Sequence, residues 1–247
     1  MSASSPIDAV HVWLTPVSAV SDARRRAVYE SLLTAEEHQR LRRFIPDEPR
    51  REFLVGRALA RLMLTRFGGA PPEAWRFRLT PHGRPELADR PPGVADLRFN
   101  LSHTRGLVAC ALTVGRELGV DVEYVRRPVT HDVAERFFSA REAADLRALP
   151  EAERPSAFFD YWTLKEAYIK ARGLGLALPL GQFTFARSAD GRPPRVTFDP
   201  ALDDRPETWQ FALRSPTPDH RLAVAVRRSG PDLPLVVDEV VPEVPAA

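Results

Sequence analysis

Two acidic side chains, Asp121 and Glu123, stand two positions apart in the segment LGVDVEY (residues 118–124). In an extended strand alternate side chains share a face, so both carboxylates are expected on one face, about 6–7 Å apart, beside Gly119. Two neighbouring negative charges repel each other, and an oxygen-rich pair of this kind suits a hard divalent cation such as Mg²⁺ that also holds phosphate. The alternative is an exposed strand face on which both acids are simply solvated.

A second group of charges lies in the segment YWTLKEAYIKARG (residues 161–173). At about 100° per residue its small and apolar residues form one stripe, and Lys165, Glu166 and Lys170 fall on the opposite side. Trp162 and Ile169 share that side, which is unusual for a solvated face, so we expect a helix covered on both sides. Charges in such a place need a partner, an ion or an anionic ligand. The alternative is a surface ion pair between Glu166 and Lys170, one helical turn apart.

Further polar residues lie near turns. The segment FNLSHT (residues 99–104) places Ser102 and His103 at the end of a predicted strand, where they close a turn or donate to a phosphate or sugar oxygen. Arg84 stands in a tight Gly-Arg-Pro turn, and Arg40 belongs to an arginine-rich stretch before a predicted long helix. Taken singly, such residues are more often solvent-facing than functional. The Gly-x-Ser-x-Gly elbow of hydrolases, the phosphate-binding glycine loops and the His-Glu-x-x-His zinc motif are all absent from the sequence.

The elements that must position these residues predict an α+β chain. Helices are expected at about 22–33, from 35 after a Thr34–Glu37 capping box, at 50–67, 131–149 and 153–173, with short strands between and after them. This order gives two similar subdomains, residues 1–114 and 115–230, each a small, mostly antiparallel sheet with a long helix packed on it. The proline-rich tail at 231–247 is expected to pack loosely, and a ligand is expected at the seam between the halves.

The overall composition excludes several classes of protein. The 247 residues include 35 basic and 33 acidic side chains, a net charge of +2, which argues against a nucleic-acid partner. The single cysteine, Cys110, excludes an internal disulfide framework and a multi-cysteine metal site. We find neither a signal-peptide pattern nor an apolar stretch of about 20 residues, so we expect a cytoplasmic protein with no membrane partner. Among the basic residues only Lys165 and Lys170 are lysines, which favours a site that needs a compact charge.

Taken together, these segments resemble the ordered motifs of the Sfp-type 4′-phosphopantetheinyl transferase family. The resemblance spans about residues 36–185 and is carried by the Gly-Arg-Pro turn, FNLSHT, GVDVE (119–123) and W-x-x-KEA-x-x-K-x-x-G (162–173). The segment FFS-x-x-E (137–142) also fits. The last two motifs of the first set, in tandem, are highly specific, whereas the Gly-Arg-Pro turn alone has no weight.

The resemblance implies an α/β-type pseudo-dimer that binds coenzyme A in the cleft between its halves. It implies transfer of 4′-phosphopantetheine to a serine of an apo acyl or peptidyl carrier protein, with release of adenosine 3′,5′-bisphosphate. By motif, the Mg²⁺ ligands would be Asp121, Glu123 and Glu166. The residues that hold coenzyme A would be Arg40, Arg84, Ser102, His103, Lys165 and Lys170.

The resemblance and the residue chemistry together predict one mechanism. Mg²⁺ would withdraw charge from the phosphorus under attack, Lys170 and Lys165 would neutralise the leaving oxygen, and Glu166 would deprotonate the carrier serine. The catalytic set is therefore Glu166, Lys170 and Asp121. Metal ligation and proton transfer compete for the same lone pairs of Glu166. Two alternatives stay open, a non-catalytic coenzyme A or nucleotide-binding protein and a Mg²⁺-dependent pyrophosphate hydrolase. A monomer is expected, because one chain supplies both halves.

Overall fold

The computed structural model describes residues 8–129, 131–187 and 192–244 of the chain. The alternation of Val10, Val12 and Leu14 predicts an opening strand over residues 7–17, of which the first residue, Ile7, lies outside these ranges. The chain divides into two compact units: unit 1 comprises Met1–Arg116 with Leu233–Ala247, and unit 2 comprises Glu117–Asp232. Each unit is a mixed α+β structure with a small sheet and one long helix, which confirms the predicted fold class. None of the helices in the described ranges has the length and apolar character needed to cross a bilayer.

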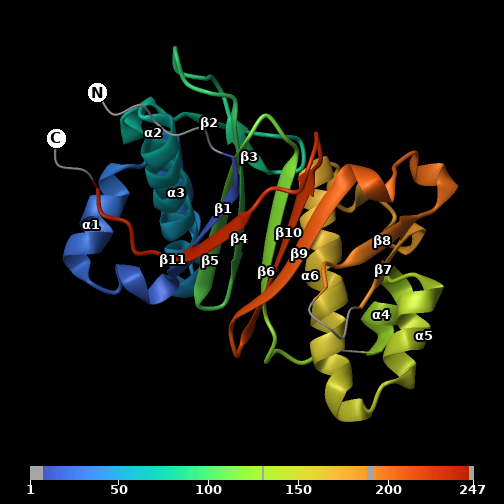
Figure 1. The fold of residues 1–247 in the computed structure, drawn as a ribbon. Coiled ribbons are helices and arrows are strands. Elements are labelled where there is room, and N and C mark those ends of the chain that lie inside the picture. Colours follow the sequence, from blue (N-terminus) through green and yellow to red (C-terminus); the bar gives the residue numbers. More distant parts are fainter. Residues whose placement is uncertain (1–7, 130, 188–191, 245–247) are drawn as a thin grey trace. The chain divides into compact units, whose positions relative to one another are not determined.

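Unit 1 is built on a four-stranded sheet in the order β11-β1-β5-β4 (Figure 1). Strands β1 (Val10–Pro16), β5 (Leu107–Val114) and β4 (Leu97–Thr104) pair antiparallel, and β11 (Leu235–Glu239) lies parallel to β1. The expectation of a loosely packed tail is therefore wrong for this segment. The sequence stretch was judged by its prolines, but Pro234 only precedes the strand, and its carbonyl accepts the backbone N–H of Val10 at 2.8 Å.

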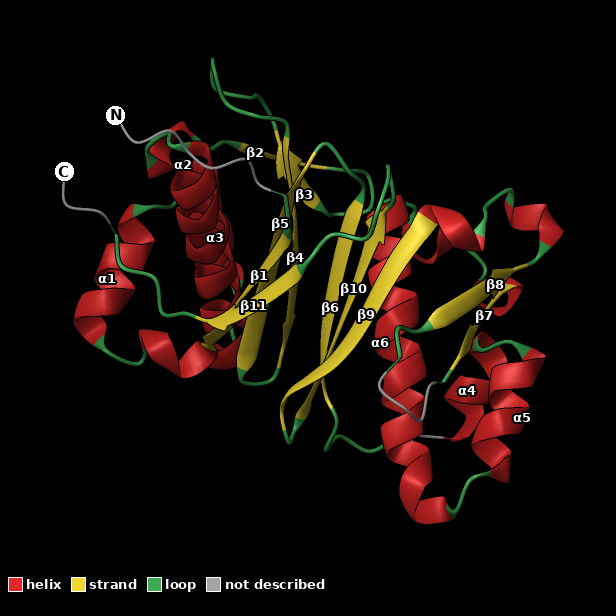
Figure 2. Cartoon of the chain, in the orientation of Figure 1, coloured by secondary structure: helices red, strands yellow, loops and turns green. Residues whose placement is uncertain are grey.

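The helices of unit 1 cover this sheet. The long helix α3 (Asp47–Gly68) packs against β5 and β4, preceded by α1 (Ala23–Ser31) and α2 (Ala35–Arg43). The predicted capping box is present, since the Thr34 side chain accepts the N–H of Glu37 and Glu37 accepts the N–H of Thr34. A hairpin of β2 (Phe77–Leu79) and β3 (Pro85–Leu87) carries the Gly-Arg-Pro turn (Figure 2).

Unit 2 has a three-stranded antiparallel sheet in the order β6-β10-β9, formed by β6 (Leu118–Tyr124), β10 (His220–Arg227) and β9 (Trp209–Thr217). Its long helix, α6 (Arg154–Arg172), packs against β6 and β10. A hairpin of β7 (Phe183–Ala186) and β8 (Arg195–Phe198) follows. The helix expected at 131–149 is divided into α4 (His131–Phe137) and α5 (Ala140–Ala148), because Ser139 opens a new capping box with Glu142.

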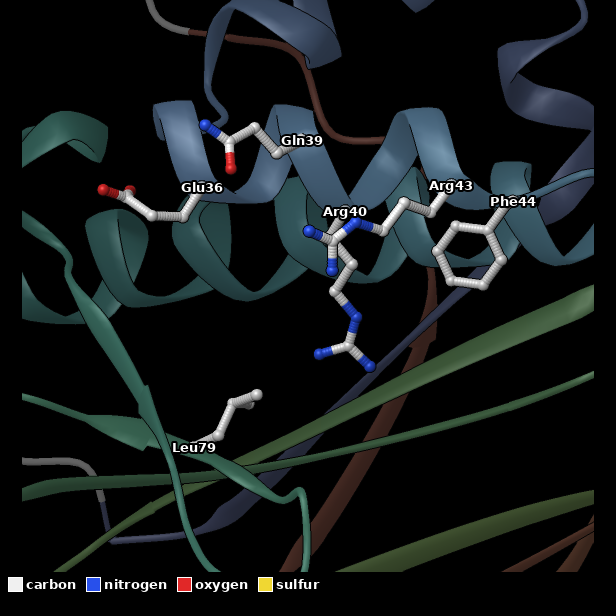
Figure 3. Close-up of a pocket in the computed structure, with 6 residues that line it drawn as sticks. All are labelled: Glu36, Gln39, Arg40, Arg43, Phe44 and Leu79. Carbon is white, nitrogen blue, oxygen red and sulfur yellow. The ribbon is translucent and has the colours of Figure 1, made fainter.

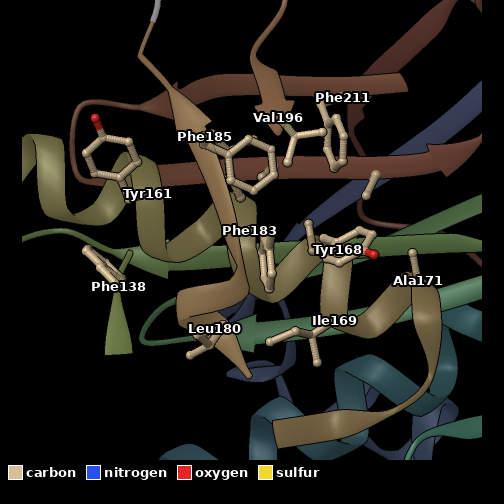
Figure 4. Packing of buried hydrophobic residues seen from close by; sticks show 14 of the residues in the cluster. Phe138, Tyr161, Tyr168, Ile169, Ala171, Leu180, Phe183, Phe185, Val196 and Phe211 are labelled. Carbon is tan, nitrogen blue, oxygen red and sulfur yellow. The ribbon is translucent and has the colours of Figure 1, made fainter. Parts of the chain in front are cut away.

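Aromatic residues dominate the core of unit 2, where Tyr168, Phe183 and Phe185 pack together (Figure 4). Tyr168 and Phe183 meet edge to face with ring centroids 4.8 Å apart. Short 3₁₀ turns connect the elements of both units: η1 (Val17–Val20), η2 (Pro72–Ala74), η3 (Glu151–Glu153), η4 (Gly175–Ala177), η5 (Leu180–Gln182), η6 (Pro200–Leu202) and η7 (Pro206–Thr208). The packed core fixes α6 and β6, the two elements that carry the acidic residues.

Candidate active site

Close packing between β6 and α6 depends on Gly119. A Cβ atom at this position would lie 2.0 Å from the carbonyl oxygen of Ala167 and 2.4 Å from the backbone nitrogen of Ala171. The helix backbone therefore lies directly on the strand, and only a residue without a side chain fits between them. This approach brings the charged side chains of α6 next to those of β6.

The carboxylate of Asp121 on β6 is buried and accepts a hydrogen bond from Lys170 on α6, with 2.7 Å between Lys170 Nζ and Asp121 Oδ1. The expectation that α6 is covered on both sides is confirmed, because Ile169 and Ala167 are both buried. Lys170 reaches the strand, so its ion pair joins residues 49 positions apart in the sequence.

Glu123 lies on the same strand and is held at one oxygen. Its Oε1 accepts the indole N–H of Trp162 at 2.8 Å, and the guanidinium of Arg127 lies 3.1 Å from the same oxygen. Burial, with the negative charge of Asp121 as a second cause, raises the pKa of Glu123 from 4.5 to about 7. The alternative of two solvated acids on an exposed face is therefore wrong, since Asp121 is 4% exposed and the Glu123 side chain 15%.

Glu166 joins this group from α6. Burial raises the pKa of its carboxyl, and the negative charge of Asp121 raises it further, while Lys170 opposes both effects. Asp121 thus influences both glutamates. Asp121 is therefore the residue that links Lys170, by direct contact, with the two glutamates, by its charge.

The three carboxylates are donors of the type that a hard divalent cation prefers. Within residues 8–129, 131–187 and 192–244, no group of three or more His, Cys, Asp or Glu side chains is already arranged around a metal position. However, Asp121, Glu123 and Glu166 offer hard oxygen donors, and their mutual repulsion is what a bound cation would relieve. In the structure, Lys170 donates to Asp121, and Trp162 and Arg127 contact Glu123.

Lys165 does not belong to this group. Its side chain is fully buried, and its ammonium donates to the carbonyl oxygens of Leu180 (2.8 Å) and Phe183 (2.6 Å) and forms an ion pair with Glu142 (2.8 Å). Contact of this ammonium with a diphosphate is incompatible with that position, so its predicted ligand-binding role is corrected. The helical projection placed Lys165 among charged neighbours but could not distinguish a ligand from a carboxylate inside the core.

The remaining predicted residues lie in unit 1. His103 on β4 forms an ion pair with the buried Glu52 of α3, with 2.9 Å between Nδ1 and Oε2, and its own side chain is 60% exposed. Ser102, the neighbour of His103, is buried. Arg84 Nε lies 3.8 Å from a carboxylate oxygen of Glu86.

Arg40 lies in a pocket of about 580 Å³, which is lined also by Glu36, Gln39, Arg43, Phe44 and Leu79 (Figure 3). Its guanidinium stands 5.3 Å from the centroid of the Phe53 ring. Two arginines and a hydrophobic wall in one pocket suit a phosphate attached to an apolar or aromatic group.

Several residues that contact the site were not singled out for it by the sequence. Arg127 and Trp162 bind Glu123, Glu52 binds His103, and Glu142 binds Lys165. Only the pair of Arg127 with Glu123 could be expected from the sequence, because an acid and an arginine four positions apart often pair. The others are separated by at least 23 positions and depend on tertiary packing.

Comparisons with known proteins agree with these features. Residues 117–225 match the 4′-phosphopantetheinyl transferase superfamily, and residues 23–114 match the family described as 4′-phosphopantetheinyl transferase, N-terminal. The 4′-phosphopantetheinyl transferase HetI of Nostoc sp. is 38% identical over 69% of this chain and 71% of its own length. The 4′-phosphopantetheinyl transferase Sfp of Bacillus subtilis is 31% identical over 83% of this chain and 86% of its own length.

Proposed function

Since this chain belongs to the 4′-phosphopantetheinyl transferase family, we propose that it moves 4′-phosphopantetheine from coenzyme A to a serine of an acyl or peptidyl carrier protein in a Mg²⁺-dependent reaction. The observation that carries the proposal is the meeting of β6 and α6, where Asp121 influences both Glu123 and Glu166 and binds Lys170. Adenosine 3′,5′-bisphosphate is the second product.

The proposed step exchanges one phosphate ester for another. The serine oxygen of the carrier attacks the phosphorus that bears the pantetheine arm, and a new P–O bond forms. The P–O bond to the adenosine phosphate breaks, and its electron pair stays on the departing oxygen. The serine proton passes to a base, for which we propose Glu166, because a buried carboxyl with a raised pKa holds a proton more readily near neutral pH.

Charge on the diphosphate needs positive partners. Mg²⁺, when bound, would supply positive charge to the diphosphate oxygens, and Asp121, Glu123 and Glu166 would hold it. Lys170 is proposed to donate to the departing oxygen, and Asp121 keeps its ammonium directed toward β6. A compact ammonium with three rotatable donors suits this task better than a guanidinium.

The side chains of unit 1 are proposed to hold the nucleotide end of coenzyme A. His103 has a carboxylate partner, Glu52, whose Oε2 lies 2.9 Å from Nδ1 and orients the ring. Ser102, Arg84 and Arg40 supply further hydroxyl and guanidinium donors for phosphate oxygens.

The decisive experiment incubates the protein with coenzyme A, Mg²⁺ and an apo carrier protein, and follows the carrier by mass spectrometry. Transfer adds the mass of 4′-phosphopantetheine to the carrier only when Mg²⁺ is present. Coenzyme A cleavage without a carrier would instead indicate a pyrophosphate hydrolase, and binding without either reaction would indicate a non-catalytic protein. Either result would contradict the proposal.

The two proposed roles of Glu166 are separated by the variant Glu166→Gln. If Glu166 acts mainly as a ligand, a higher Mg²⁺ concentration restores most of the transfer rate. If it acts mainly as the base, saturating Mg²⁺ does not restore the rate, and the acidic limb of the pH profile of kcat is lost. Lys170→Arg serves as the matched test of the ammonium and is expected to lose most of its activity.

A further inference from the structure

Lys165 is a buried charged residue that the proposed reaction does not use. An ammonium group has three N–H donors, and the structure gives Lys165 Nζ three acceptors: the carbonyl oxygens of Leu180 and Phe183 and Oε2 of Glu142, at 2.8, 2.6 and 2.8 Å. The side chain is 0% exposed. All of its hydrogen-bonding capacity is therefore directed to other parts of unit 2.

The partner carboxylate is itself fixed on every side. Oε2 of Glu142 accepts the backbone N–H of Ser139 at 2.9 Å, and its Oε1 accepts the backbone N–H of Phe185 at 2.8 Å. The Phe183 ring lies 4.3 Å from Lys165 Nζ, measured to its centroid. One ion pair thus joins α6 to the start of α5 and to the η5–β7 segment, where Leu180 and Phe183 pack in the core (Figure 4).

The opposite side of the helix is fixed by the strand. Ala167 and Ala171 lie about 200° and 240° around the helix from Lys165, and their backbone atoms contact β6 at Gly119. Glu166 and Lys170 lie at about 100° and 140°, between the two anchored sides. A helix held on both sides cannot rotate or slide without moving these two residues away from Asp121.

We propose that the Lys165–Glu142 pair is a positioning device, which sets the rotation of α6 and thereby holds Glu166 and Lys170 against Asp121. The inference rests on the proposed roles of Glu166 and Lys170. It gives the lysine of the W-x-x-KEA segment a task that requires no contact with coenzyme A. An arginine could not replace it, because a planar fork does not direct three donors to these three acceptors.

The test compares variants that lose the pair with a variant that only weakens the same core. Lys165→Met keeps the length of the side chain and removes the ammonium, and Lys165→Met/Glu142→Gln removes both charges. Val196→Ala is the control, because Val196 is buried in the same cluster but lies on β8. For each variant, Tm is measured first, and kcat and KM for the carrier are then measured at a temperature where that variant is folded.

Both variants that lose the pair are expected to lower kcat by about 10²-fold, the loss typical of a displaced catalytic group, with KM for the carrier nearly unchanged. Val196→Ala is expected to lower Tm but to keep kcat. The double variant is expected to regain part of the Tm lost by Lys165→Met without regaining kcat. The proposal is overturned if kcat follows Tm through the whole series, as a purely stabilising pair would require.

If the Lys165→Met protein is too unstable to measure, the double variant is compared with Val196→Ala instead, and that comparison decides. Failure of the proposed function is recognised separately, because it would abolish Mg²⁺-dependent transfer by the unmodified protein. If transfer does occur, Glu166→Gln and Lys170→Arg are expected to lower its rate. Failure of the positioning proposal alone leaves those two effects intact.

Discussion

The long helices of the two units bury basic side chains by the same device. In unit 1, Glu37 is the third residue of α2 and closes its capping box, and it lies 2.8 Å from Arg61 and 3.4 Å from Arg57 of α3. In unit 2, Glu142 is the third residue of α5, closes its capping box, and lies 2.8 Å from Lys165 of α6. In both units one carboxylate caps a short helix and binds a buried cation on the long helix.

The two helices differ in the charges that remain after this anchoring. On α3, Arg57 and Arg61 share one carboxylate; burial lowers the pKa of Arg57 to about 10, and the nearby charges of Arg40 and Arg61 add to that effect. Around α6 the surplus is acidic, because Asp121, Glu123 and Glu166 outnumber Lys170 and Arg127. The anchor therefore does not determine what each unit binds. The surplus charge differs in sign between the two units, and the acidic surplus agrees with the cation site proposed for unit 2.

The variant Asp121→Asn would remove the central charge of the acidic site and keep its shape. We expect the transfer rate to fall about 10²–10³-fold, because the cation loses a ligand and Lys170 loses its ion pair. Mass spectrometry of the carrier measures the rate. Asp219→Asn is the control, since Asp219 is 47% exposed in its ion pair with Arg126 and is expected to matter little. An equal loss of transfer rate in Asp121→Asn and Asp219→Asn would contradict a specific role of Asp121.

The packing of the two helices can be compared by adding one methyl group to each unit. Gly119→Ala places a Cβ atom 2.0 Å from the carbonyl oxygen of Ala167, so we expect a loss of about 3 kcal/mol or more in the free energy of unfolding, together with lost activity. Gly56→Ala on α3 meets only Val108 at 3.8 Å and is expected to be neutral or stabilising by up to about 1 kcal/mol. Urea unfolding measures both, and similar losses would refute the difference in packing.

The indole of Trp162 is expected to orient Glu123 toward the cation. Trp162→Phe keeps a ring and removes the N–H donor, so the affinity for Mg²⁺ should fall about tenfold. Isothermal titration with MgCl₂ measures this affinity. Trp209→Phe is the matched control, because it removes a similar N–H bond to a carboxylate, that of Asp204, at 3.0 Å. An unchanged Mg²⁺ affinity in Trp162→Phe would contradict the proposal that Trp162 orients Glu123.

The raised pKa of Glu123 predicts a dependence of stability on pH in Mg²⁺-free buffer. The folded protein binds this proton more tightly than the unfolded chain, so the contribution is present below about pH 4.5 and is lost as pH rises to about 7. Relative to Glu123→Gln, Tm of the unmodified protein should fall across this window by roughly 7–14 °C, at about 1.4 kcal/mol per pKa unit and about 2–4 °C per kcal/mol. If Tm changes with pH in the same way for the unmodified protein and for Glu123→Gln, the raised pKa of Glu123 is contradicted.

The strand and helix that carry the acidic site could be predicted from the sequence. Alternation on β6 and the 3.6-residue period on α6 are local patterns, and they place Asp121 and Glu123 on one face of the strand and Glu166 and Lys170 on one side of the helix. The Thr34–Glu37 capping box was equally local. Lys165 was misjudged, because a helical projection shows which residues share a face but not what covers that face.

Contacts between residues far apart in the sequence could not be predicted. The ion pair between Lys170 and Asp121 and the bond between Trp162 and Glu123 join residues 49 and 39 positions apart. Strand β11 could not be predicted, because every residue after Leu235 is exposed. Its short sequence therefore lacks the alternation of apolar and polar residues that indicates a strand. Its place depends on β1, which lies more than 200 residues earlier.

Strand β11 also makes unit 2 an insertion within unit 1. The oxygen of Val240 accepts the hydroxyl of Thr15 at 2.6 Å, and the oxygen of Pro242 accepts the hydroxyl of Tyr29 at 2.9 Å. During synthesis from the N-terminus, unit 2 leaves the ribosome complete while the sheet of unit 1 still lacks its edge strand. Until β11 emerges, β1 presents an unpaired edge of the kind that recruits foreign strands. The newly made chain is thus most vulnerable to misassociation at β1 during the interval between the synthesis of β1 and that of β11.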